Sequence, residues 1–105
     1  AIIAGGMPKS AFAAKSQARA CAIAVVDLLR DRAPAAPKLI NTCYSLVAPD
    51  YGISIAGVYQ PANGLLTDVP GAGGVSPLDA PKSVRQQEAA YAEAWFKTIT
   101  RSVFG

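Results

Sequence analysis

One cysteine, Cys43, lies inside a stretch that otherwise predicts a β-hairpin, LINTCYSLVAPDYGISIAGVY at residues 39–59. A thiol near the middle of a strand has three interpretations. It is a small buried hydrophobe, or it forms a disulfide with Cys21, or it is a reactive sulfur whose partner lies outside this chain. Burial is the commonest state of a strand cysteine, and a disulfide with Cys21 requires a helix to cross directly over the strand.

Other catalytic groups are scarce in the sequence. The chain has no histidine, which removes the commonest general base and the commonest metal ligand. Two distant cysteines do not make a zinc site without further ligands. Neither a Ser-His-Asp nor a Cys-His arrangement can be assembled, so we expect no metal site and no catalytic triad.

The composition indicates one folded domain over residues 1–105. Hydrophobic residues make up 51% of the chain and charged residues only 16%, which argues against disorder. The net charge of +3 comes from scattered Lys and Arg, so we expect no nucleic-acid surface. The longest apolar stretch, ACAIAVV, is much shorter than the roughly 18 residues of a membrane span. The chain opens on AIIAGG without an initiating Met, and we expect a fragment of a larger protein.

A helix is predicted from about Ser10 to Arg30. Ser10 can cap it, with Pro8 just before or in its first turn, and Pro34 and Pro37 prevent it from continuing. Steps of three and four residues give one apolar stripe, which we expect to pack against the rest of the domain. The stripe comprises Ala11, Ala14, Ala18, Cys21 or Ala22, Val25, and Leu28 or Leu29.

Three short strands are expected next, at about 41–47, 53–59 and 65–69, joined by the turns PDYG and QPANG. They would form an antiparallel β-meander. Residues 70–82, PGAGGVSPLDAPK, predict a long Gly/Pro loop with a contact or covering role. Its GAGG glycines do not match a phosphate loop, since no strand feeds a helix there and no GK[ST] follows.

The last element is a helix from about Ser83 to Val103. Ser83 and Gln86 have the spacing of a capping box. We expect one face of this helix to carry Tyr91, Ala94, Trp95 and Ile99, with Phe96 and Val103 beside it. The fold class is therefore α+β: a long N-terminal helix, a three-stranded antiparallel meander, a long Gly/Pro loop and a C-terminal helix.

The entrance to the first helix, GGMPKSAF, has two interpretations that the residues alone leave open. It is an ordinary turn followed by an N-cap, or it is an anion-binding end. The second interpretation rests on Lys9, Lys15 and Arg19, whose positive charge adds to that of the free N–H groups at a helix N-terminus.

Four stretches in this order resemble the C-terminal part of the flavoprotein subunit of flavocytochrome c sulfide dehydrogenase. They are MPKSAFAAKSQARACA, NTCYSLVAPDYGISIAGVY, PGAGGVSPLDAPKSVR and AEAWFKTITRSVFG. The resemblance runs over the whole chain. It implies a relative of the glutathione-reductase-type flavoproteins that oxidises sulfide and passes electrons through FAD to a c-type cytochrome subunit in the bacterial periplasm.

The resemblance also implies roles for particular residues. The cysteine of NTCYS, Cys43, would be half of a redox-active disulfide beside the flavin, with its partner in an N-terminal part of the subunit. Cys21 does not match that partner and is expected to be a core thiol. Pro8, Lys9 and Ser10 would present N–H groups to the pyrimidine edge of the flavin. Tyr44 and Trp95 would complete the cofactor-binding residues.

The family's dinucleotide-binding glycines are absent from these residues, so the chain would supply one wall of a flavin site and be inactive alone. Its partners would be the N-terminal FAD- and NAD-type domains of the same subunit and a cytochrome that carries the haem. Two alternatives remain. Isolated, the chain is a non-catalytic interaction or dimerisation module, or it belongs to a quinone-linked sulfide oxidoreductase. The second needs a membrane-binding surface near the C-terminus.

Overall fold

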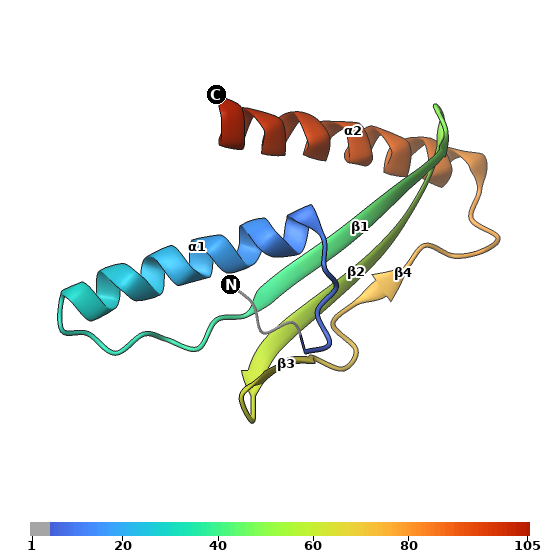
Figure 1. The fold of residues 1–105 in the computed structure, drawn as a ribbon. Coiled ribbons are helices and arrows are strands. Elements are labelled where there is room, and N and C mark those ends of the chain that lie inside the picture. The colour runs from blue at the N-terminus through green and yellow to red at the C-terminus, as the bar shows by residue number, and fades with distance from the viewer. Residues whose placement is uncertain (1–4) are drawn as a thin grey trace. The chain divides into compact units, whose positions relative to one another are not determined.

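The computed structural model describes residues 5–105 and confirms the α+β class (Figure 1). Its elements follow one another as α1 (Ala11–Leu29), β1 (Leu39–Ala48), β2 (Tyr51–Ala62), β3 (Leu65–Asp68), β4 (Gly74–Val75) and α2 (Lys82–Phe104). Within the described residues, neither helix combines the length and the hydropathy that crossing a membrane would need.

The chain folds into two compact units. Unit 1 comprises Ala1–Thr42 and Ala56–Gly74, and unit 2 comprises Cys43–Ile55 and Val75–Gly105. Unit 1 thus holds α1 and β3, and unit 2 holds α2. The strands β1 and β2 each contribute residues to both units.

The sheet is the predicted antiparallel meander in the order β1-β2-β3. Strands β2 and β3 pair from Tyr59 opposite Asp68 to Ala62 opposite Leu65. Asn63 and Gly64 join them with φ angles of 51° and 77°, the left-handed pair that a tight hairpin turn requires. The turn is therefore shorter than QPANG, whose first three residues belong to β2.

The Gly/Pro loop is not wholly irregular. It contains β4, which pairs with β2, and the backbone N–H of Ser76 donates to the carbonyl of Ser54 at 2.9 Å. Sequence patterns missed this strand because two residues are too few to show an alternation.

In unit 1, a small core joins Met7, Ala13, Leu39 and Tyr59, with Ala20 and Leu66 packed against it. The amide of Gln17 donates to the sulfur of Met7 at 3.4 Å. Helix α1 thus contributes alanines and polar side chains to the packing, rather than its large apolar residues.

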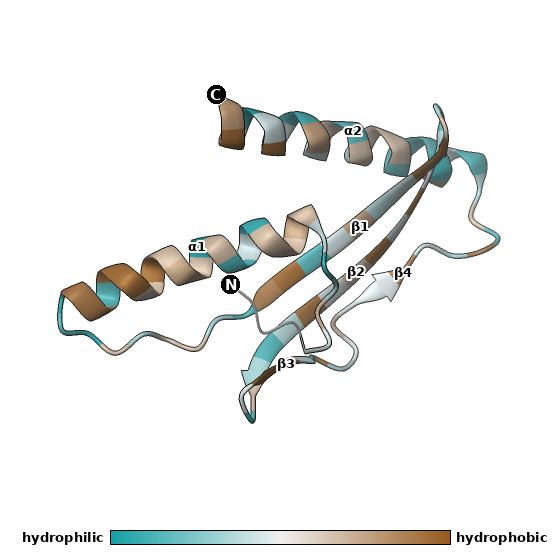
Figure 2. Ribbon diagram, viewed as in Figure 1, coloured by the Kyte–Doolittle hydropathy of each residue, from teal (hydrophilic) through white to brown (hydrophobic). Residues whose placement is uncertain are grey.

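The predicted apolar stripe of α1 is wrong. Ala11, Ala14, Ala18 and Cys21 are exposed, whereas Ala13 is buried and Ala20 and Ala24 are half-buried. Exposure extends to the large apolar residues of its C-terminal half, which are Ile23, Val25, Val26, Leu28 and Leu29, whereas Phe12 in the first turn is half-buried. Figure 2 shows these hydrophobic positions gathered in the C-terminal half of α1. Cys21 is therefore an exposed thiol and not a core residue.

In unit 2, helix α2 lies close against β2 at Gly52. A Cβ atom added at Gly52 would come within 2.4 Å of the backbone nitrogen of Ala89, so no larger residue fits there without a backbone shift. Ala89 is buried in this contact, and Ala92, one turn further along α2, is buried too. Small residues on both elements therefore set the spacing between helix and strand.

The expected capping box of α2 is wrong. The N-cap residue is Pro81, which makes no side-chain capping bond, so Ser83 and Gln86 do not form a capping box. Of the four residues expected on one face, Trp95 and Ile99 are half-buried, whereas Tyr91 and Ala94 are exposed. The buried positions are instead Arg85, Ala89 and Ala92, with Glu88 half-buried.

Substitution of Gly52 by Ala will destabilise the chain by about 1–3 kcal/mol, because the new methyl group overlaps the backbone of α2. Urea denaturation followed by circular dichroism measures the change. Gly74→Ala is the matched control, since no atom of residues 5–105 lies within 4 Å of its added Cβ, and it will change stability by less than about 0.5 kcal/mol. Equal effects of the two substitutions would contradict the close approach.

Candidate functional site

The entrance to α1 in unit 1 is fixed by Ser10. Its hydroxyl oxygen accepts a hydrogen bond from the backbone N–H of Ala13 at 3.0 Å, and its carbonyl accepts from Ala14 at 2.9 Å. The same hydroxyl donates to the side-chain oxygen of Asn41 on β1 at 2.5 Å. Asn41 is only 1% exposed. The predicted N-cap is therefore confirmed, and it also fastens the helix entrance to β1.

The charge at this entrance suits an electron-rich group. The first turn of α1 carries no acidic residue, so no carboxylate neutralises the positive end of the helix dipole. Pro8 and Lys9 are both exposed just before it. The pyrimidine edge of a flavin, which gains negative charge on reduction, is a group of this kind, so the residues present fit a flavin.

Cys43 lies on β1, two residues after Asn41, and is half-buried. Cys21 belongs to unit 1 and Cys43 to unit 2, and no disulfide joins them. The structure therefore excludes two of the three interpretations of Cys43. It is not a fully buried hydrophobe, and Cys21 is not its disulfide partner.

Tyr44 and Trp95 form an aromatic pair in unit 2. Their ring centroids lie 6.4 Å apart at an interplanar angle of 38°, which is within the range of favourable aromatic contacts. An open groove of about 380 Å³ borders the pair. Leu46 and Phe96 add apolar surface to this groove, while Glu93 and Lys97 bring opposite charges to it. The structure therefore brings together two of the predicted cofactor-binding residues from distant positions in the chain.

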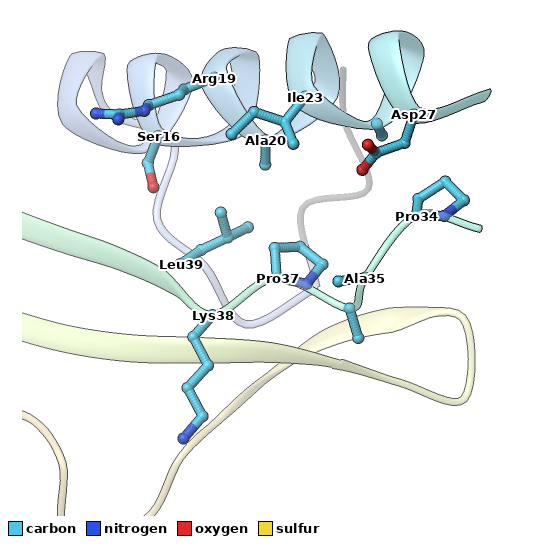
Figure 3. Close-up of a pocket in the computed structure, with 12 residues that line it drawn as sticks. Ser16, Arg19, Ala20, Ile23, Asp27, Pro34, Ala35, Pro37, Lys38 and Leu39 are labelled. Carbon is cyan, nitrogen blue, oxygen red and sulfur yellow. The ribbon is translucent and has the colours of Figure 1, made fainter. Parts of the chain in front are cut away.

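A second groove lies in unit 1 and was not anticipated from the sequence. It has a volume of about 340 Å³, between α1 and the segment 34–39. Figure 3 shows Ala20 and Asp27 directed from α1 toward this segment. Asp27 is held there by an ion pair with Arg32 at 2.7 Å. Pro34 and Pro37, which were expected only to end the helix, also form part of the wall.

The predicted site residues thus fall into two groups. Pro8, Lys9 and Ser10 belong to unit 1, and Cys43, Tyr44 and Trp95 belong to unit 2. Sequence reasoning missed Asn41, the partner of Ser10, because a polar strand residue carries no local signal of a contact 31 positions away. Among residues 5–105, no cluster of three or more His, Cys, Asp or Glu side chains could hold a metal ion.

These elements define a small α+β domain whose candidate contacts are a helix N-terminus in unit 1 and a strand thiol and an aromatic pair in unit 2. The sequence model of one protein family, flavocytochrome c sulphide dehydrogenase, flavin-binding, matches residues 35–104, about two thirds of the chain. The chain belongs to this family. Its cofactor class is a flavin, and it is a domain of an oxidoreductase subunit. The match includes Cys43, Tyr44 and Trp95 but not the entrance to α1.

Replacement of Ser10 by Ala will lower the free energy of unfolding by about 1–2 kcal/mol, because Ala13 loses its cap and Asn41 loses a hydrogen bond in a buried position. Urea denaturation measures this loss. Ser83→Ala removes a hydroxyl that does not cap α2 and will cost less than about 0.5 kcal/mol. A Ser10 variant as stable as the Ser83 variant would contradict the role of Ser10.

Proposed function

We propose that this chain is the C-terminal domain of an FAD-dependent sulfide:cytochrome c oxidoreductase. It contributes one wall of the FAD site and one redox cysteine, and it is inactive without the N-terminal FAD- and NAD-type domains of the same subunit. Its second partner is a c-type cytochrome subunit that carries the haem, in the bacterial periplasm. The observation that carries the proposal is the family match, which spans Cys43.

Cys43 is the redox residue of the proposal. Its thiol pairs with a cysteine elsewhere in the subunit to form a disulfide. Hydrosulfide attacks one of the two sulfurs of that disulfide. The attacked cysteine becomes a persulfide, and the other cysteine leaves as a thiolate. The half-buried position of Cys43 supports this role, because a reactive thiol needs access to its substrate.

The entrance to α1 holds the cofactor in this proposal. A bound flavin supplies the two-electron oxidation and the onward transfer of electrons to the haem partner. Ser10 keeps the first turn of α1 formed, and Lys9 adds a positive charge that stabilises the electron-rich edge. The absence of acidic residues from the first turn of α1 supports this assignment.

Tyr44 and Trp95 are the cofactor-binding residues of unit 2 in this proposal. Tyr44 follows Cys43 directly on β1, and the ring of Trp95 packs near it. Aromatic side chains exclude water from their surroundings while their polar ends keep hydrogen-bonding capacity. In the proposal, these two side chains line the pocket around the sulfur of Cys43. They keep water away from that sulfur, which favours its reaction with sulfide.

The first test is an absorbance spectrum of the chain after incubation with FAD and desalting. We expect a colourless chain, because one wall of a site does not retain the cofactor alone. Adding separately produced N-terminal domains of the subunit will restore the flavin absorbance. A chain that stays colourless with those domains, and that self-associates instead, would support the alternative of a non-catalytic interaction module. The exposed apolar residues of α1 favour that second candidate.

Substitution of Cys43 by Ser in the whole flavoprotein will abolish sulfide oxidation while the flavin stays bound, because no disulfide remains for hydrosulfide to attack. Steady-state turnover with cytochrome c and the flavin absorbance are measured on the same sample. Cys21→Ser is the matched control. It changes the same atom at an exposed position of α1 and will leave turnover unchanged.

Undiminished turnover of the Cys43 variant would refute the redox assignment. Measuring turnover in parallel with a soluble quinone separates the two acceptors, because a quinone-linked enzyme will reduce the quinone and not the cytochrome.

A further inference from the structure

A network of polar side chains connects three elements of unit 2. The hydroxyl of Ser76, just after β4, donates to the carboxylate of Glu88 on α2, whose two oxygens each lie 2.6 Å away. The hydroxyl of Ser54 on β2 donates to the same carboxylate at 2.9 Å. The backbone N–H of Ser54 in turn donates to the hydroxyl of Ser76 at 2.7 Å. One carboxylate therefore ties α2 to β2 and to the chain after β4.

Arg85 extends this network one turn earlier on α2. It is only 4% exposed. Its Nη2 donates to the backbone carbonyls of Pro77 and Leu78, and its guanidinium carbon lies 5.1 Å from the ring centroid of Tyr51. Its Nη1 is buried and has no hydrogen-bond partner among residues 5–105, and it lies 3.8 Å from the carboxylate of Glu88. Glu88 is thus the carboxylate that balances a buried positive charge.

Hydrogen bonds to buried charged side chains fix the position of a helix more strictly than contacts between alanines do. Ala89 meets Gly52 of the hairpin through small apolar surfaces, and such a contact contains no directional bond. Hydrogen bonds from Ser54 and Ser76 to Glu88 need defined distances and angles. A displacement of α2 along the strands would break them and leave Arg85 charged and buried. The network therefore sets the register of α2 on β2.

The register of α2 on β2 also determines where Trp95 meets Tyr44. Arg85, Glu88, Ala92 and Trp95 follow one another at steps of three and four residues, so they share one face of α2. At one end of this face Arg85 and Glu88 contact β2 and the loop, and at the other Trp95 meets Tyr44 of β1. Because a helix is rigid over two to three turns, fixing one end fixes the other.

We propose that Arg85 and Glu88 are the positioning residues of the Trp95–Tyr44 pair. They hold α2 so that Trp95 packs against the residue that follows Cys43 on β1. Their importance for catalysis rests on the proposed function, in which this pair lines the flavin pocket. Their role in positioning the pair does not rest on the proposed function, because it can be measured on the chain without flavin or sulfide.

Trp95 is the only tryptophan of the chain, so its fluorescence reports its surroundings without interference. Glu88→Gln keeps the size of the side chain but removes the charge. We expect its Trp95 emission to shift to longer wavelength and its quenching by acrylamide to increase, and we expect Tm to fall by about 10 °C or more. Ser76→Ala, which alters no atom of α2, will shift the emission in the same direction by less.

The matched control is Asp50→Asn. Asp50 forms an ion pair with Lys82 of the same helix at the same 3.8 Å, but both side chains are more than half exposed. This substitution will leave the emission of Trp95 unchanged, since exposed ion pairs contribute little. Ser76→Thr retains the hydroxyl that donates to Glu88 and will return the emission and the acrylamide quenching toward those of the unsubstituted chain.

A Glu88→Gln variant that melts at a lower temperature with unchanged Trp95 emission and quenching would overturn the proposal, because Glu88 would then act only on stability. So would a Ser76→Thr variant that behaves like Ser76→Ala. Failure of flavin binding or of sulfide oxidation in the whole enzyme refutes the proposed function instead and leaves the fluorescence results standing.

Discussion

Buried polar side chains determine how each helix of this protein sits on its strands. In unit 1 the buried residue is Asn41, which accepts a hydrogen bond from Ser10 at the entrance to α1. In unit 2 it is Arg85, which is paired with Glu88 on the same helix. A buried polar group that loses its partner is left unsatisfied, which costs about 1–3 kcal/mol and more when the group is charged. Both units therefore depend on directional bonds, with small apolar contacts filling the remaining space.

The candidate site residues lie next to these bonds. Ser10 is itself one partner, Cys43 follows Asn41 by two residues, and Trp95 shares a helix face with Glu88. Groups that bind a cofactor work best when their own supports hold them in place. The residues that form these bonds and the candidate site residues beside them belong to the same helix or strand. A disturbance of one is therefore transmitted to the other through a few residues of regular backbone.

The sequence predicted both helices and the first three strands to within a few residues, because capping and alternation are local signals. It failed on the faces of α1. There the large apolar residues of the C-terminal half lie outward. The inner face consists of Ala13, the half-buried Phe12, Ala20 and Ala24, and half-buried polar residues, a mixture that hydrophobicity does not identify. It also failed on the contacts of Glu88, because Ser54 lies 34 positions away and serines in strands and loops are common.

The outward apolar residues of α1 have a consequence for the thermodynamics of unfolding. Ile23, Val26 and Leu29 already contact water in the folded chain, so unfolding exposes less additional apolar surface from them than from buried residues of the same size. The heat capacity change of unfolding arises mainly from newly exposed apolar surface. The free energy of unfolding of this chain therefore varies with temperature along a flatter curve than its hydrophobic content suggests. Any surface that covers this side of α1 makes that curve steeper by the area it buries.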